Sequence, residues 1–136
     1  MKNTKNIKII RFFDEVYSHE FVVVFAPTHE EFCEFMYDKN LLTELNMPSV
    51  FFDCDSSDDS GTFLGRVLRS HSYKEQKDYI LIYSSDENET LVHEIFHACY
   101  GVLSGHDIEL SKETNEAYAY YIGYIWKMIK KRMKEN

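Results

Sequence analysis

The sequence predicts a single-domain α+β protein. Strand-like runs occupy the first two thirds of the chain and are interrupted by one helical pattern, whereas the last third holds two consecutive helical patterns. A chain of 136 residues with 44% apolar side chains can build one hydrophobic core but not two. We therefore expect a small mixed or antiparallel sheet, with the last two helices packed against it.

The first elements are expected to be two strands and a helix. Residues 6–13 and 20–26 are short β-branched and aromatic runs, which are typical of strands. Thr28, with Glu31 three residues later, is a capping-box pattern and predicts the start of a helix. Apolar side chains recur on one stripe of this segment, so we expect the helix to continue to Leu42.

The middle of the chain is expected to add three more strands. Residues 49–55 follow a proline and form a strand-like run, and residues 56–61 have the composition of a turn. Residues 62–70 are predicted to be extended, with Gly65 as a bulge or a point of close backbone approach. Residues 78–85 give the clearest strand pattern of the three.

Two helices are expected to complete the chain. Asp86, with Glu89 three residues later, predicts a helix start, and the pattern ends near Gly105. The final helix is expected to begin near Ser111, with Glu113 in its first turn, and to continue almost to the C-terminus.

The composition bears on partners and compartment. The net charge of −8 argues against nucleic acid as a partner, and the one basic run, Lys127–Lys134, lies at a predicted helix end. The most apolar late segment, Ala117–Ile129, is too short to span a bilayer, so no membrane partner is expected. An odd number of cysteines without CxxC spacing favours a reducing compartment, and no signal-peptide core is apparent. We therefore expect a cytoplasmic protein without a disulfide framework.

The strongest motif is HEIFH, at residues 93–97. Residues four apart lie on one helix face, so His93 and His97 can direct their imidazoles at one metal ion. Glu94 is rotated about a quarter turn away and can reach a water molecule beside the metal as a general base. We expect a polar stripe of His93, His97 and Tyr100. The apolar side of the helix is expected to comprise Leu91, Val92, Ile95, Phe96, Cys99 and Leu103.

A catalytic zinc needs a third protein ligand and an open position for water. We favour Glu116, near the start of the final helix, because the intervening loop is long enough to fold that helix back. Glu109 and His106 within the loop are competitors. Cys54 is another competitor, because a thiolate is an excellent zinc ligand.

These residues resemble a known family. HEIFH followed by the Glu116 of "NEA" is similar to the gluzincins, the thermolysin-like branch of the zincin-fold metallopeptidases, over about a third of the chain. The resemblance implies a minimal stand-alone zincin, as found in phages and bacteria, with one Zn²⁺ held by His93, His97 and Glu116 and with Glu94 activating water. It also implies a peptide or protein substrate that adds as a strand to an edge strand of the sheet. That edge strand is expected to comprise Thr62, Phe63, Leu64, Gly65, Arg66, Val67 and Leu68.

The chain departs from the family at two points. An acid normally follows the ligand glutamate by four residues and orients a ligand histidine, whereas Tyr120 stands there in this sequence. The large second domain that clamps substrate is also missing, which leaves room for a partner chain to complete the cleft. A donor to the tetrahedral oxyanion is expected among Tyr100, His106 and Tyr118, each of which can instead be a packing or solvent-facing side chain.

Two other interpretations compete with this one. Asp53 and Asp55 after a strand resemble the nucleophile motif of haloacid-dehalogenase-type phosphatases, but nothing later supplies the lysine and acidic pair that the chemistry needs, so an acidic turn is favoured. The remaining rival to a peptidase is a non-catalytic, zinc-stabilised module that binds a protein. A structural zinc takes four protein ligands, and the sequence offers no obvious fourth, which favours catalysis.

Overall fold

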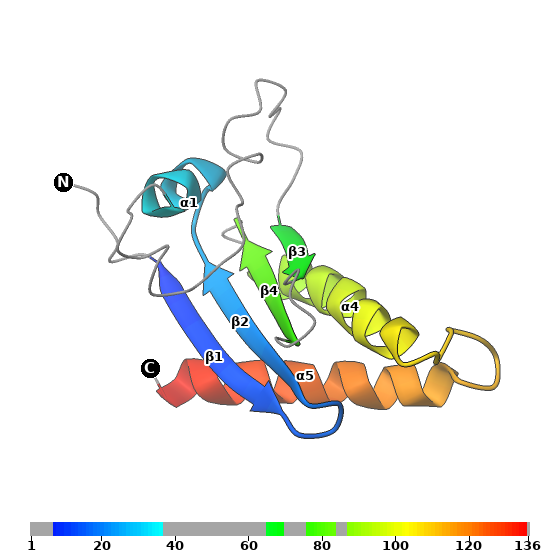
Figure 1. Cartoon of the computed structure of the whole chain (residues 1–136). Coiled ribbons are helices and arrows are strands. Elements are labelled where there is room, and N and C mark those ends of the chain that lie inside the picture. Colours follow the sequence, from blue (N-terminus) through cyan, green and yellow to red (C-terminus); the bar gives the residue numbers. More distant parts are fainter. Residues whose placement is uncertain (1–6, 37–64, 70–75, 84–86, 136) are drawn as a thin grey trace, which may run out of the picture.

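The structure is a computed structural model that describes residues 7–36, 65–69, 76–83 and 87–135. Four strands form one mixed sheet in the order β1-β2-β4-β3 (Figure 1). In chain order the elements are β1 Lys8–Asp14, β2 His19–Phe25, α1 His29–Met36, β3 Gly65–Arg69, β4 Lys77–Ile82, α4 Glu87–Gly105 and α5 Asn115–Glu135. The α+β prediction is confirmed. The predicted strand 49–55 and the predicted helical turn 37–42 lie outside the described residues.

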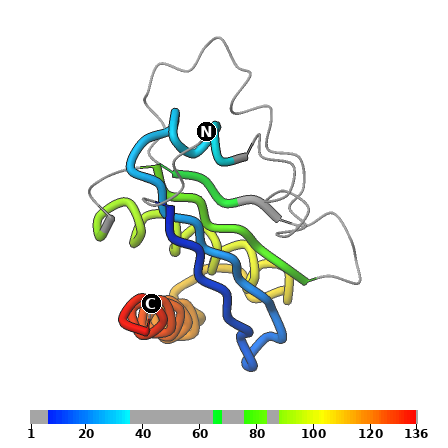
Figure 2. Tube along the Cα trace, turned by 90° about the vertical axis from the view of Figure 1, so that its left-hand side faces the viewer, coloured from blue at the N-terminus to red at the C-terminus, as the bar shows by residue number. Residues whose placement is uncertain are grey.

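The helices cover the two faces of the sheet unequally. α4 and α5 lie together on one face, and α1 lies on the other (Figures 1 and 2). β2 pairs with β1 antiparallel and with β4 parallel, so β2 and β4 are the central strands. Both are buried on both faces, which explains their continuous apolar runs FVVVF and YILI.

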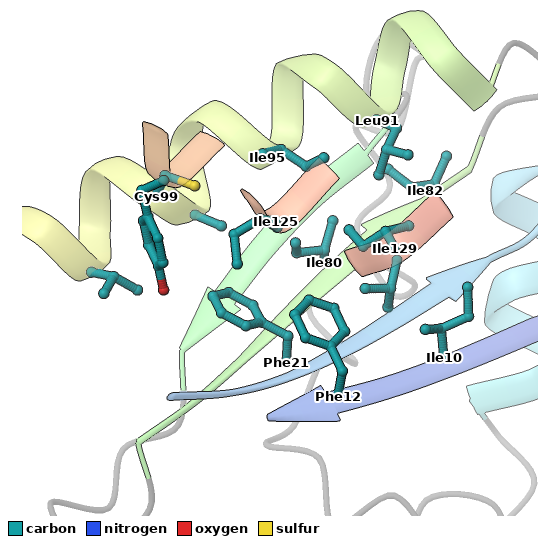
Figure 3. Packing of buried hydrophobic residues seen from close by; sticks show 14 of the residues in the cluster. Ile10, Phe12, Phe21, Ile80, Ile82, Leu91, Ile95, Cys99, Ile125 and Ile129 are labelled. Atoms are coloured by element: carbon teal, nitrogen blue, oxygen red, sulfur yellow. The ribbon is translucent and has the colours of Figure 1, made fainter. Parts of the chain in front are cut away.

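The main core lies between the sheet and the helix pair (Figure 3). Strand side chains alternate, so Phe21 and Val23 of β2 face α4 and α5, while Val22 and Val24 face α1. The C-terminal helix packs through every third or fourth residue. Its buried members are Tyr118, Tyr121, Ile125 and Ile129.

The start of α1 agrees with its sequence signal. The backbone N–H of Glu31 donates to Thr28 Oγ1 at 3.1 Å, so Thr28 caps the helix as predicted. The expectation of no disulfide is wrong for Cys33 on this helix, because Cys33 is disulfide-bonded. Cys99 is a free, buried thiol. The cysteine pattern therefore no longer argues for a reducing compartment.

The junction between α4 and α5 differs from the prediction in detail. α4 ends at Gly105 as expected, but the left-handed residue that stops it is Asp107, with φ of 63°. The N–H of Ile108 donates to the carbonyl of Leu103 at 2.9 Å, which is the Schellman pattern. α5 begins four residues later than expected, because Ser111 and Thr114 bond each other's backbone N–H and form a turn.

No helix in the described ranges combines the length and the apolar character needed to cross a bilayer.

Candidate metal centre

The exposed face of α4 presents the two histidines of HEIFH as a pair. The Nε2 atoms of His93 and His97 lie 3.2 Å apart, and their ring centroids lie 4.8 Å apart. Both side chains are exposed, so the pair is open to solvent. The helix spacing alone produces this convergence, because residues four apart lie one turn above the other.

The separation of the two nitrogens fits a metal. Two nitrogens that bind one tetrahedral zinc at about 2.0–2.1 Å lie about 3.3 Å from each other. The observed 3.2 Å is close to this value. In the absence of a metal, the same distance fits a hydrogen bond in which the N–H of one imidazole donates to the ring nitrogen of the other. The separation of the two nitrogens is therefore compatible with two ligands of one tetrahedral zinc ion.

Glu94 lies beside the pair but under the edge of the sheet. Glu94 is only 7% exposed, whereas its neighbours His93 and His97 are exposed. Burial raises the pKa of Glu94, and the positive charge that the two histidines can carry partly lowers it. A raised pKa is one of the properties that a glutamate general base has.

Gly65 of β3 makes room for Glu94. A Cβ placed on Gly65 would lie 2.9 Å from Glu94 Cγ and 2.8 Å from the carbonyl oxygen of Leu81. Such distances are too short for any side chain, so only glycine fits here. The predicted close approach of the backbone at Gly65 is confirmed, and it brings β3 directly against the candidate base.

The apolar side of α4 differs from the prediction at two positions. Val92 is 49% exposed and Phe96 is 39% exposed, so neither belongs to the core. Phe96 instead packs edge-on against His97, at 5.9 Å between ring centroids, and contacts Tyr100. The buried stripe is rotated around the helix axis relative to the expected one. Ala98 and Val102 take the two core places.

Glu116 is not brought to the histidine pair. It is an exposed residue in the first turn of α5, and Tyr118, two residues later, is buried. Two residues correspond to about 200° around a helix, so Glu116 projects from the side of α5 opposite to its buried stripe. Within the described ranges, no three His, Cys, Asp or Glu side chains lie close enough to hold a metal ion.

The other predicted ligands lie in different surroundings. Glu109 accepts a hydrogen bond from Ser104 Oγ at 3.1 Å. Ser104 follows His97 by seven residues, or two helical turns, so Glu109 lies at the end of the histidine stripe. His106 donates its Nδ1 proton to the carbonyl of Val102 at 2.9 Å and so caps α4. Cys54 lies outside the described residues.

The tyrosines expected near the transition state take three separate roles. Tyr100 is 41% exposed on the histidine stripe and stays close to the pair through Phe96. Tyr118 is buried, and its hydroxyl donates to the carbonyl of Ile108 at 2.6 Å, so it holds the loop instead of facing solvent. Tyr120 is 76% exposed on the same outer side of α5 as Glu116.

The predicted substrate strand is partly described. Gly65, Arg66 and Val67 belong to β3, which pairs with β4 on one side and is the last strand of the described sheet. Leu68 also lies in β3. Thr62, Phe63 and Leu64 lie outside the described residues. β3, the last strand of the sheet that the described residues form, therefore runs past Glu94.

The sequence analysis missed a second buried carboxylate, Asp14, at the end of β1. It accepts hydrogen bonds from the N–H groups of Val16 and Tyr17 and from the hydroxyl of Tyr121. The signal was present, because Asp14 falls on the same strand face as Ile10 and Phe12. An acid at a core position needs partners from another element, and Tyr121 of α5 supplies one.

Comparison with known proteins adds no relative: no family model, no curated protein and no solved structure matches the chain. The chemistry of the site therefore has to be argued from its own geometry. That geometry joins two solvent-open imidazoles, a buried glutamate with a raised pKa, and an edge strand beside it.

Proposed function

We propose that the chain is a zinc-dependent metallopeptidase of the gluzincin type, with His93 and His97 as metal ligands and Glu94 as general base. The observation that carries the proposal is the 3.2 Å separation of the two Nε2 atoms, which suits two ligands of one tetrahedral ion. The order HExxH, with the acid directly after the first histidine, adds the base at the position where the chemistry needs it.

The role that we propose for each residue follows from its surroundings. A bound zinc lowers the pKa of water towards about 7 and polarises the scissile carbonyl. Glu94 takes the proton from that water and delivers it to the leaving amine. Its burial under β3 favours this cycle, since a raised pKa lets the carboxyl hold the proton between the two steps. Tyr100 is an exposed tyrosine on the same helix face as His93 and His97, and its hydroxyl is our candidate donor to the oxyanion.

The substrate is expected to bind along β3. An extended peptide adds to an exposed sheet edge through main-chain hydrogen bonds, which suits a protein or peptide of varied sequence. Gly65 lies against Glu94, so a strand paired with this part of β3 would run past the general base. This proximity supports a peptide substrate over a small molecule.

The third ligand is proposed to be a carboxylate. Glu116 remains our prediction from the motif, and it requires the first turn of α5 to rotate towards the pair. Glu109 is the alternative: its partner Ser104 lies on the same face of α4 as the pair, although two helical turns, about 10 Å, beyond His97. Both are exposed, so neither loses a buried partner by turning to a metal.

The zinc content of purified variants tests the ligand set. We expect about one zinc per chain in the wild type and in His29→Ala, a control histidine on α1 at the opposite face of the sheet. His93→Ala and His97→Ala should lose the metal. Glu116→Gln and Glu109→Gln distinguish the two candidate third ligands, because the variant that lacks the actual ligand should lose most of its zinc. Glu113→Gln, at an exposed glutamate, is the matched control and should keep its zinc. Full zinc in His93→Ala would place the metal elsewhere.

The same proteins separate catalysis from binding. Glu94→Gln should keep its zinc and lose hydrolysis of a generic unfolded protein, by at least about a hundredfold if the glutamate is the base. One observation favours the second candidate, a non-catalytic zinc-stabilised binding module: no third ligand joins the pair among the residues the structure describes. Zinc-loaded wild type that binds unfolded chains without cleaving them would establish that alternative.

A further inference from the structure

A pocket lies between the β1–β2 turn and the N-terminal half of α5. Its volume is about 350 Å³. This region is separate from the histidine pair, because its helix contribution comes from α5 and not from α4. The lining residues are Val16, Tyr17, Ala117, Tyr120, Tyr121 and Tyr124.

The walls of this pocket are aromatic. Tyr17 meets Tyr121 edge-on, with ring centroids 4.9 Å apart and planes at 80°. Tyr121 and Tyr124 are nearly parallel, at 12° and 6.4 Å. Tyr120 is 76% exposed, the highest exposure of any large hydrophobic side chain in the described residues. Tyrosine rings in several orientations therefore line one space, and the face of an aromatic ring carries partial negative charge.

A negative group lies behind the rings. Asp14 is fully buried, and its carboxylate accepts hydrogen bonds from three pocket residues: Val16, Tyr17 and Tyr121. Within the described ranges, no lysine or arginine forms an ion pair with Asp14. The charge therefore acts on the pocket without a local cation to offset it.

Two glutamates adjoin lining residues of the pocket in the sequence, and one lysine, Lys127, lies one helical turn beyond Tyr124. Glu15 precedes Val16 in the turn and is exposed. Glu116 precedes Ala117 and lies one helical turn before Tyr120, and it is also exposed. The whole chain has a net charge of −8, so the long-range field favours a cation as well.

We propose that this pocket binds the cationic side chain of an arginine or lysine in a basic segment of a partner protein. Aromatic faces attract such cations, and a desolvated position strengthens the attraction. A buried carboxylate behind the rings and the two glutamates next to lining residues complement the charge. A purely apolar occupant would use the rings but gain nothing from these acids.

This binding does not depend on the metal or on Glu94, so it can be tested in the metal-free chain. In the metal-free chain Glu116 keeps the outward direction that it has on α5, which places it on the same side of the helix as Tyr120. Loss of cation binding would leave the metallopeptidase proposal unaffected, and loss of zinc would leave the pocket unaffected.

The test is an NMR titration of the isotope-labelled full chain with two capped peptides, acetyl-Gly-Arg-Gly-amide and the same peptide with citrulline in place of arginine. Citrulline has nearly the same shape as arginine but no charge. We expect saturable shifts of the Tyr17, Tyr120 and Tyr124 ring signals with arginine, at a millimolar Kd for one side chain, and at least about threefold weaker binding of citrulline. Binding should weaken as salt is added.

Variants assign the binding to the rings. Tyr120→Leu should weaken arginine binding about three- to tenfold, and Tyr120→Phe should retain it, because the ring supplies the attraction. Tyr100→Leu, an exposed tyrosine on α4, should bind like the wild type. Tyr120 is largely exposed, so its replacement should leave the fold intact.

Three results would overturn the proposal. Equal binding of the citrulline peptide would make the pocket an apolar groove. Absence of saturable shifts at the pocket tyrosines would mean that no such site exists. Shifts of these signals on dilution of the protein alone would show that a second copy, through its own basic run Lys127–Lys134, is the occupant.

Discussion

Asp14 and Glu94 are both buried acids beside the sheet, but their surroundings are opposite. Asp14 is fully buried and accepts three hydrogen bonds, from two backbone N–H groups and the Tyr121 hydroxyl. Glu94 is 7% exposed, and its pKa is raised by burial more than the neighbouring histidines lower it. Asp14 therefore has hydrogen-bond donors around its carboxylate, whereas the burial of Glu94 disfavours the charged form of that side chain.

This difference makes Asp14 a structural acid, whereas Glu94 is the acid that we propose to act as general base. Asp14 ties the end of β1 to the middle of α5, so its hydrogen bonds help to fix the position of the C-terminal helix. Glu94 has a glycine opposite it and two exposed imidazoles beside it, which is a costly place for an acid without a function. Substitutions of these two acids themselves should therefore act in opposite directions on stability.

The largest effect is expected at Asp14. Asp14→Ala leaves the Tyr121 hydroxyl and two backbone N–H groups without their acceptor, which should cost about 3 kcal/mol of the free energy of unfolding. Urea denaturation followed by circular dichroism measures the loss. Tyr121→Phe removes one of the three bonds and should cost less, about 1 kcal/mol. If both variants unfold at the wild-type midpoint, Asp14 does not organise the fold.

A smaller loss is expected at Gly65. Gly65→Ala places a methyl group against the Leu81 carbonyl and the Glu94 side chain, and should destabilise the chain by about 1–3 kcal/mol. The matched control is Gly123→Ala on α5, where nothing lies within 4 Å, and where alanine should stabilise the helix by about 0.5–1 kcal/mol. Thermal melts of the two variants should therefore move in opposite directions. A stabilised Gly65→Ala would show that β3 does not approach Glu94.

The smallest effect, and one of opposite sign to that at Asp14, is expected at Glu94 itself. A raised pKa means that the folded chain holds this proton more tightly than the unfolded chain. The associated stability is present below the ordinary pKa of 4.5 and is lost as the pH rises through the raised value. Metal-free Glu94→Gln should therefore melt at a higher temperature than the wild type at pH 7, and the gap should close near pH 4. A lower melting temperature at pH 7 would mean that the charged carboxylate is stabilised in the fold.

The sequence determined the parts of this protein that depend on neighbours along the chain. The α+β class, the cap at Thr28, the extent of α4 and the pairing of His93 with His97 all follow from local periodicity and capping, because helix and strand geometry fix which residues share a face. The close approach at Gly65 was also predictable, since glycine inside a strand pattern marks crowding.

Tertiary structure decided everything that depends on how one element is rotated against another. The outward direction of Glu116, the exposure of Val92 and Phe96, and the bond between Asp14 and Tyr121 all follow from the position of α5 across α4 and the sheet. Four residues of turn before α5 shift its start, and each residue of shift rotates a helix face by about 100°. Hydrophobic periodicity places a side chain on a face, but the packing of α5 decides what that face meets.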